Sequence, residues 1–214
     1  MGNLVLVRHA STDASQEGRN LGQGSDPPLS ERGLQLADEL GRALASELSA
    51  LPATELRLVT SPALRCRQTA EVITRHIGSA PEVETERGLL EINYGSWEGL
   101  TSAECSARDP ERRAAWEADP FATSAPKGES GADVAARAFP ILESIEAWLA
   151  AGRSHAAVIV AHNHVNRLRL AALMGWRMAD YRRRLGQEPG CYSIVAFGGG
   201  LPLMRRVNAV PVGP

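Results

Sequence analysis

The chain has 214 residues, of which 43% are hydrophobic and 22% charged, as in an ordinary soluble globular protein. Its formal net charge of -2 at pH 7 creates no global field for nucleic acid or an anionic membrane, so we expect neither as a partner. No apolar run is as long as a transmembrane helix, and no signal-type segment follows Met1. The three scattered cysteines favour neither a disulfide framework nor a zinc site. We therefore expect a single domain over residues 1–214, in the reducing cytoplasm.

Strands and helices alternate along most of the chain. Leu4–Val7 is an apolar run of the length of a strand buried on both faces, and a polar, glycine-rich loop over residues 11–28 follows it. Ser30 fits a helix N-cap, and the leucines after it recur every four residues, which indicates a helix with one apolar stripe. The expected strands cover about residues 4–7, 56–60, 81–85 and 156–161, with a final hairpin of 193–197 and 203–207. The expected helices cover about residues 30–48, 61–78, 130–152 and 165–175, the second opened by Ser61-Pro62.

A segment from about residue 92 to 127 interrupts the alternation. It combines prolines, mixed charges and the tryptophans Trp97 and Trp116, which indicates an excursion of loops and short helices with the tryptophans in its core. The alternation elsewhere predicts an α/β fold, a three-layer helix-sheet-helix sandwich with a mostly parallel central sheet. We expect the excursion to lie over the active site.

Two of the expected buried strands end in a histidine. His9 follows Arg8 at the end of the first strand, and His162 follows the most apolar strand. The strand before Ser61 leads into a helix that presents Arg65 near its first turn. Because ligands bind beyond the carboxyl ends of such strands, these side chains converge if the strands are neighbours. Two guanidiniums and two imidazoles match a phosphoryl group, although Arg8 and His9 alone also fit a surface cation and a hydrogen-bonded turn histidine.

Six segments in the same order resemble the motifs of the histidine phosphatase superfamily, which includes the cofactor-dependent phosphoglycerate mutases. The resemblance runs from about Leu4 to Asn208, nearly the whole chain. The segments are Arg8-His9; Asp26-Pro27-Pro28-Leu29-Ser30 with Gly33 and Gln35; Ser61-Pro62-Ala63-Leu64-Arg65 with Gln68-Thr69-Ala70; Leu90-Glu91 with Tyr94-Gly95 and Trp97-Glu98-Gly99; Pro126-Lys127-Gly128-Glu129-Ser130; and His162.

The resemblance implies a phosphohistidine mechanism with no metal and no other cofactor. In it, His9 attacks phosphorus, and Arg8, Arg65 and His162 bind the phosphoryl oxygens. Glu91 protonates the leaving oxygen and then helps to activate water. The residues expected to contact the substrate are Arg8, Arg65, Thr12, Arg19, Asn20, Gln23 and Asn163. The predicted function is hydrolysis of a small phosphorylated metabolite.

The chain departs from the family pattern at several positions. Ala10 replaces the usual glycine, and Asn163 stands where one branch has an aspartate as the acid, which leaves Glu91 in that role. Taken alone, Glu91 also fits a solvated loop carboxylate. We expect His164 to be structural or at the rim, since two nearby histidines without carboxylates or thiolates are weak evidence for a metal. We interpret the run Arg182-Arg183-Arg184 as a solvated helix face.

Two other functions stay open. Mutases that resemble this fold usually have a longer excursion and a lysine-rich or acidic tail, whereas Lys127 is the only lysine here, which favours water as the phosphoryl acceptor. A non-catalytic phospholigand-binding protein on the same fold would have lost His9, Arg65 or Glu91, and none is lost. The particular phosphomonoester and the oligomeric state, a homodimer included, are also open.

Overall fold

A single mixed sheet organises the molecule. The computed structural model describes residues 1–51, 53–78, 81–152 and 154–211. Within these ranges, six strands lie in the order β3-β2-β4-β1-β5-β6. They are β1 (Gly2–Arg8), β2 (Glu55–Thr60), β3 (Val83–Thr85), β4 (His155–Ala161), β5 (Tyr192–Phe197) and β6 (Leu203–Ala209). The pairs β1–β4, β2–β4 and β2–β3 are parallel, whereas β1–β5 and β5–β6 are antiparallel, so the predicted mostly parallel sheet is confirmed.

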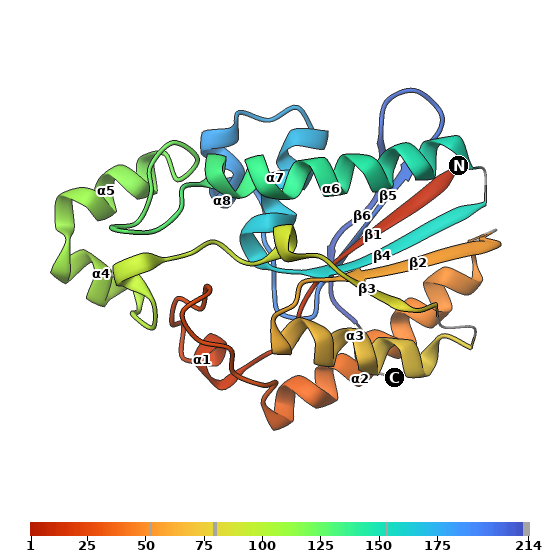
Figure 1. The fold of residues 1–214 in the computed structure, drawn as a ribbon, viewed down its shortest axis with the longest axis horizontal. Coiled ribbons are helices and arrows are strands. Elements are labelled where there is room, and N and C mark those ends of the chain that lie inside the picture. The colour runs from red at the N-terminus through yellow and green to blue at the C-terminus, as the bar shows by residue number, and fades with distance from the viewer. Residues whose placement is uncertain (52, 79–80, 153, 212–214) are drawn as a thin grey trace.

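Helices cover both faces of the sheet. The helices α2 (Glu31–Ser49) and α3 (Leu64–His76) lie on one face, and α6 (Gly131–Ala151) and α7 (Asn163–Leu173) lie on the other (Figure 1). Successive side chains of a strand point to opposite faces, and β1 divides accordingly between the two cores. Val5 and Val7 pack on the α2–α3 side, whereas Leu4 and Leu6 pack on the α6–α7 side. The three-layer architecture predicted from the sequence is therefore confirmed.

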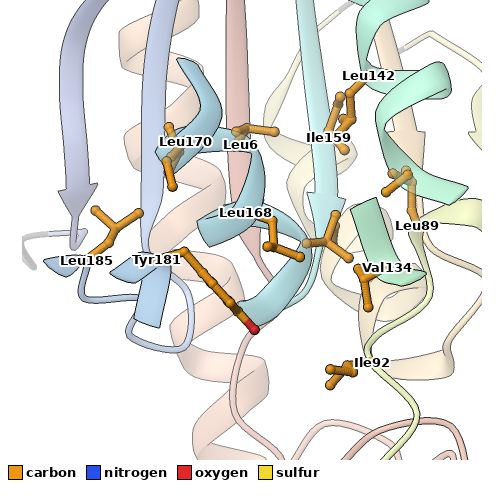
Figure 2. Close-up of a cluster of buried hydrophobic side chains, with 14 of the residues drawn as sticks. Leu6, Leu89, Ile92, Val134, Leu142, Ile159, Leu168, Leu170, Tyr181 and Leu185 are labelled. Carbon is orange, nitrogen blue, oxygen red and sulfur yellow. The ribbon is translucent and has the colours of Figure 1, made fainter. Parts of the chain in front are cut away.

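The core on the α6–α7 side continues from the sheet toward the excursion. Figure 2 shows Leu6 of β1 and Ile159 of β4 facing Leu142 of α6 and Leu168 of α7. The same cluster includes Trp97 and Trp116, both almost completely buried, with ring centroids 6.0 Å apart. The excursion is thus attached to the sheet through a shared hydrophobic core.

The excursion itself consists of short elements. They are the 3-10 helix η2 (Gly95–Trp97) and the α-helices α4 (Ser102–Arg108) and α5 (Pro110–Ala118). The 3-10 helix η1 (Arg87–Leu89) lies just before the excursion. Figure 1 shows α4 and α5 beyond the edge of the sheet at which β1 ends. Thr101 caps α4 in a capping box with Glu104, and Pro110 opens α5, so the local sequence defines both starts.

Some local details differ from the sequence-based expectations. Helix α3 begins at Leu64, not at Ser61-Pro62, because the Ser61 N–H continues the ladder to the Val160 carbonyl at 3.0 Å. The periodicity also did not indicate α1 (Asp13–Gln16), η3 (Met178–Asp180) or α8 (Tyr181–Arg184), which are too short to show one. Ala10, which stands where the family usually has glycine, causes no backbone strain. Among the described residues, the non-glycine residues with positive φ are Lys127 and Asn208, so Ala10 is not one of them.

No helix in the described ranges is both long and apolar enough to cross a membrane.

Candidate active site

Neighbouring strands bring the two strand-end histidines together. In the parallel pairing of β1 with β4, Arg8 lies opposite Ala161, and the His9 N–H donates to the Ala161 carbonyl at 3.0 Å. The next residue on β4 is His162, whose ring centroid lies 5.2 Å from that of His9. Two imidazoles that are 153 positions apart in the chain therefore share one edge of the sheet.

His9 is held as a neutral imidazole with one free nitrogen. Its ring is buried, and Nδ1 lies 2.8 Å from the Ala10 carbonyl oxygen. A carbonyl can only accept, so Nδ1 carries the proton and Nε2 has the lone pair. Burial lowers the pKa of His9 well below its usual value, and the guanidiniums of Arg65 and Arg8 lower it further. The result is a nucleophilic nitrogen at neutral pH.

The two arginines are fixed by the backbone of loops. Arg65 is buried, and its Nη2 donates to the Gly22 carbonyl at 3.0 Å while Nη1 lies 3.6 Å from Asp26 Oδ1. Arg8 Nη1 donates to the Gln187 carbonyl. The Nε atoms of both arginines are buried and have no hydrogen-bond partner within the described chain. Each guanidinium thus retains donor capacity for an anion, although the loops already fix its position.

His162 is oriented by groups on β2 and α3. Arg65 Nη2 lies 3.4 Å from His162 Nδ1, and Ser61 Oγ lies 2.8 Å from Nε2. Because a guanidinium can only donate, Nδ1 accepts and the Nε2–H donates to the serine hydroxyl. Burial and then Arg65 lower the pKa of His162 well below its usual value.

Glu91 is a buried carboxyl group close to these cations. Its Oε1 accepts from the Ile92 N–H at 2.8 Å, and both carboxylate oxygens lie 3.3 Å from the His164 N–H. Burial raises the pKa of Glu91, while the two N–H groups and the arginines Arg65 and Arg8 partly oppose that rise. The alternative interpretation from the sequence, in which Glu91 is a solvated loop carboxylate, is therefore wrong.

The loop that carries Glu91 is fixed by Arg137 on α6. Arg137 donates to the carbonyls of Gly88 at 2.8 Å, Leu90 at 2.6 Å and Glu91 at 3.0 Å, and it pairs with Glu129 at 2.9 Å. One guanidinium thus satisfies three carbonyls in the segment that runs from η1 to Glu91.

A cavity of about 210 Å³ opens onto this cluster. The sequence-predicted residues that line it are Arg8, His9, Arg19, Asn20, Glu91 and Asn163. Arg65 and Gln23 line a separate cavity of about 280 Å³. No group of three histidine, cysteine or carboxylate side chains in the described chain is arranged to hold a metal ion.

Two residues expected to bind substrate are engaged elsewhere. Thr12 is fully buried and serves as the N-cap of α1, where its hydroxyl accepts from the Ser15 N–H at 3.1 Å. The Gln23 side-chain amide donates to the Glu91 carbonyl at 2.7 Å, so it supports the acidic loop. Arg19, which does line the cavity, is paired with Glu17 and Glu104.

Six residues that line the cavity were not among the predicted site residues. They are Ser15, Gly18, Leu21, Tyr94, Ser102 and Arg182. Tyr94 belongs to the motif that follows Glu91, and its hydroxyl lies 2.8 Å from His164 Nε2, while Tyr181 lies 2.6 Å from Nδ1 of the same ring. His164 is therefore a buried structural residue, as expected. Arg182 was assigned to a solvated face because only the folded chain brings α8 to the cavity.

Comparisons with known proteins agree with this geometry. The family model of the histidine phosphatase superfamily (branch 1) matches residues 4–210. The chain is 34% identical over 188 residues to the glucosyl-3-phosphoglycerate phosphatase of Mycobacterium tuberculosis strain ATCC 25618 / H37Rv, covering 83% of this chain and 78% of the relative. It is 31% identical over 210 residues to the 2,3-bisphosphoglycerate-dependent phosphoglycerate mutase of Methylobacterium radiotolerans, covering 96% of this chain and 90% of the relative. A solved mycobacterial glucosyl-3-phosphoglycerate phosphatase in complex with VO3 superposes with a TM-score of 0.80 at 28% identity, covering 98% of this chain and all of the other.

A buried histidine pair, two arginines and an acidic loop thus lie together at one edge of an α/β sheet. The chain belongs to the histidine phosphatase superfamily, branch 1. The predicted family, and with it the predicted class of enzyme, a phosphatase, are confirmed.

Proposed function

We propose that the protein hydrolyses small phosphomonoesters through a phosphohistidine on His9. The observation that carries the proposal is the unprotonated Nε2 of His9 within a cluster that also holds two guanidiniums and a carboxyl group of raised pKa. Nucleophile, anion-binding donors and acid are the three parts that phosphoryl transfer to an imidazole needs.

The first half of the proposed reaction forms the phosphohistidine. Arg8 and Arg65 hold the phosphoryl oxygens and balance the negative charge of the transition state. His162, whose ring nitrogens are engaged by Arg65 and Ser61, positions Arg65. His9 Nε2 forms a bond to phosphorus as the bond between phosphorus and the ester oxygen breaks. Glu91 in its protonated form gives its proton to that oxygen, so an alcohol leaves.

The second half returns the enzyme to its starting state. Water attacks phosphorus, Glu91 takes a proton from the water, and the bond from phosphorus to Nε2 breaks, which releases inorganic phosphate. We place Asn163, Arg19 and Asn20 around the rest of the substrate, since they line the cavity. Thr12 and Gln23 are proposed to support the loops and not to touch the substrate directly.

A mutase reaction is the second candidate, because one relative of 31% identity is a phosphoglycerate mutase. The two reactions share the first half and differ in whether water or a second substrate hydroxyl accepts the phosphoryl group. Release of inorganic phosphate in stoichiometric amount with the alcohol supports hydrolysis, whereas a requirement for added 2,3-bisphosphoglycerate supports the mutase.

Hydrolysis of p-nitrophenyl phosphate, with a chelator present, tests the proposal. We expect turnover by the parent and a loss of at least about 10³-fold in His9→Ala, as for removal of other catalytic nucleophiles. His76→Ala is the matched control, because His76 pairs with Asp38 on α2 and lies outside the site. Turnover that is equal in the parent and in His9→Ala contradicts the proposal.

We further propose that the reaction takes place in a reducing compartment such as the cytoplasm. Cys66, Cys105 and Cys191 are free and buried, so none forms a disulfide. The small net charge continues to favour a small metabolite over nucleic acid as the partner.

A further inference from the structure

Glu98 is a partly buried carboxylate that the proposed reaction does not use, and its contacts are with backbone N–H groups. It directly follows η2 in the excursion. Its Oε2 accepts from the Gly22 N–H at 3.0 Å, and its Oε1 accepts from the Gln23 N–H at 2.9 Å. The Tyr94 N–H donates to the same Oε1 at 3.2 Å. One carboxylate thus connects the excursion to a loop that lies 76 positions earlier in the chain.

Two glycines of this loop leave room for the Glu98 side chain. A Cβ atom at Gly22 would collide with Glu98 Oε1 and with the carbonyl oxygen of Ile92. A Cβ atom at Gly24 would lie 3.0 Å from Glu98 Cγ, which is closer than ordinary van der Waals contact. The absence of side chains at these two positions therefore allows the loop to close around the carboxylate.

A single peptide group links Glu98 to Arg65. The Gly22 carbonyl and the Gln23 N–H belong to the same planar peptide, so their relative positions are fixed. That N–H donates to Glu98, and that carbonyl accepts from Arg65 Nη2 at 3.0 Å. A carboxylate on the N–H side also polarises the peptide, which makes its carbonyl a stronger acceptor. Glu98 therefore determines both the position and the strength of a direct partner of Arg65.

Arg65 has a second loop contact that does not depend on Glu98. Its Nη1 lies 3.6 Å from Asp26 Oδ1, which accepts from the Leu64 N–H at 2.7 Å next to the start of α3. Its Nε is buried and has no hydrogen-bond partner within the described chain. Removal of Glu98 should therefore weaken the positioning of the guanidinium without abolishing it.

We infer that Glu98 is a positioning residue for phosphoryl binding, which acts on Arg65 through the peptide between Gly22 and Gln23. The inference rests on the proposed function, in which Arg65 holds the phosphoryl group. Glu98 is not among the residues that line the two cavities described above, so in this role it touches no substrate and transfers no proton. Its carboxylate is an internal anion bound by two successive N–H groups of the loop.

Calorimetric binding of inorganic phosphate to the parent and to Glu98→Ala tests the inference. We expect the variant to bind phosphate about tenfold more weakly, as for the loss of one charge-assisted hydrogen bond. Acetate supplies the heavy atoms that the substitution removes, so adding it should restore much of the affinity of Glu98→Ala. In the parent, acetate can only compete with phosphate. Chloride at equal ionic strength is the matched salt, and the exposed Glu111→Ala is the matched variant.

Two further variants show whether Glu98 acts through Arg65. In an Arg65→Gln background we expect Glu98→Ala to change the phosphate affinity little, because the guanidinium that it positions is absent. Glu98→Gln keeps one acceptor oxygen, so it should lose part of the affinity and gain nothing from acetate. In hydrolysis, Glu98→Ala should lower kcat/KM equally for p-nitrophenyl phosphate and glycerol 3-phosphate, since both esters present the same phosphoryl group to Arg65.

Three results would overturn the role of Glu98 while the phosphatase proposal stands. They are a parental phosphate affinity in folded Glu98→Ala, a loss that acetate leaves unchanged, and an equal loss in the Arg65→Gln background. If Glu98→Ala does not fold, Glu98→Gln in the two Arg65 backgrounds decides by the same comparison. If the parent does not hydrolyse p-nitrophenyl phosphate, the proposed function fails, and phosphate binding still decides the role of Glu98.

Discussion

His9 and Glu91 acquire their proposed roles from the same physical cause. Burial disfavours the charged form of either group, so it lowers the pKa of the imidazole and raises the pKa of the carboxyl group. One dry environment therefore supplies both an unprotonated nucleophile and a proton donor. The nearby guanidiniums strengthen the first effect and moderate the second.

Glu91→Gln tests the acid role at the scale of one residue. Glutamine cannot protonate a leaving alkoxide, so we expect kcat/KM for glycerol 3-phosphate to fall by about 10² to 10⁴. For p-nitrophenyl phosphate, whose leaving group needs little protonation, we expect a much smaller fall in kcat/KM. Steady-state kinetics on both esters checks this, with the exposed Glu111→Gln as the control.

Equal losses on the two esters would contradict the assignment of Glu91 as the acid. The ratio of the two losses is the relevant quantity, because a general disturbance of the site lowers both values together.

Single residues were predictable where they follow a strand or lie in a motif. His9, His162 and Arg65 could be placed because each comes at or just after a strand end. Arg182 could not, because its position depends on contact between α8 and α5, whose residues are about 65 positions apart in the chain. A run of three arginines by itself indicates a solvated surface. For Arg182, the first of the three, this prediction was wrong because tertiary packing places it at the cavity.

At the scale of elements, α6 controls the acidic loop through one side chain. Arg137 donates to the carbonyls of Gly88, Leu90 and Glu91 and so connects the segment that carries the acid to α6. The apolar stripe of α6 made this helix predictable from the sequence. The role of Arg137 was not predictable, because it depends on the position of a distant loop.

Arg137→Met tests this control. The substitution leaves three carbonyls with fewer partners, and we expect a loss of about 2 kcal/mol in the free energy of unfolding. We also expect kcat/KM for glycerol 3-phosphate to fall more than that for p-nitrophenyl phosphate, because the acid is displaced. Urea unfolding and kinetics on the two esters measure these effects.

Two further variants sharpen that test. Arg137→Lys keeps the charge but not the fork and should recover only part of the stability. Arg42→Met removes an exposed ion pair with Asp38 and should change the free energy of unfolding much less than Arg137→Met does. An Arg137→Met variant with parental kinetics on both esters would show that α6 does not position Glu91.

The larger elements were predictable because their patterns are long enough to be read. Helix α2 repeats its leucines over 19 residues, and β4 is a run of buried apolar residues. The short helices α1 and α8 have four residues each, about one turn, so no periodicity could indicate them. The start of α3 was misplaced because β-ladder hydrogen bonding at Ser61 outweighed the local preference of Pro62 for a first turn.

For the whole molecule, three buried histidines couple stability to pH. Burial is the largest cause of the lowered pKa of His9, His162 and His164, each well below its usual 6.5. In the unfolded chain these imidazoles bind protons as the pH falls below about 6.5, whereas in the folded protein they stay neutral. The unfolded state therefore binds more protons in weak acid.

We expect the free energy of unfolding to fall between pH 7 and pH 5, by up to about 1.4 kcal/mol per pH unit for each histidine. Glu91 acts in the opposite direction, because its raised pKa lets the folded state keep a proton that the unfolded chain releases. Three groups outweigh one, so the net slope is positive with pH. Urea unfolding at several pH values measures it, and a free energy of unfolding that is constant or rises toward pH 5 would be inconsistent with neutral buried imidazoles.

Trapping the phosphorylated enzyme is the most direct measurement of the central claim. The protein is mixed with labelled p-nitrophenyl phosphate, whose leaving group needs little protonation, then quenched in base and digested for mass spectrometry. We predict one acid-labile phosphoryl group on His9, absent from His9→Ala and accumulating when Glu91→Gln slows its hydrolysis. A phosphoryl group on any other residue, or turnover by the parent with no labelled protein at any quench time, would contradict the account.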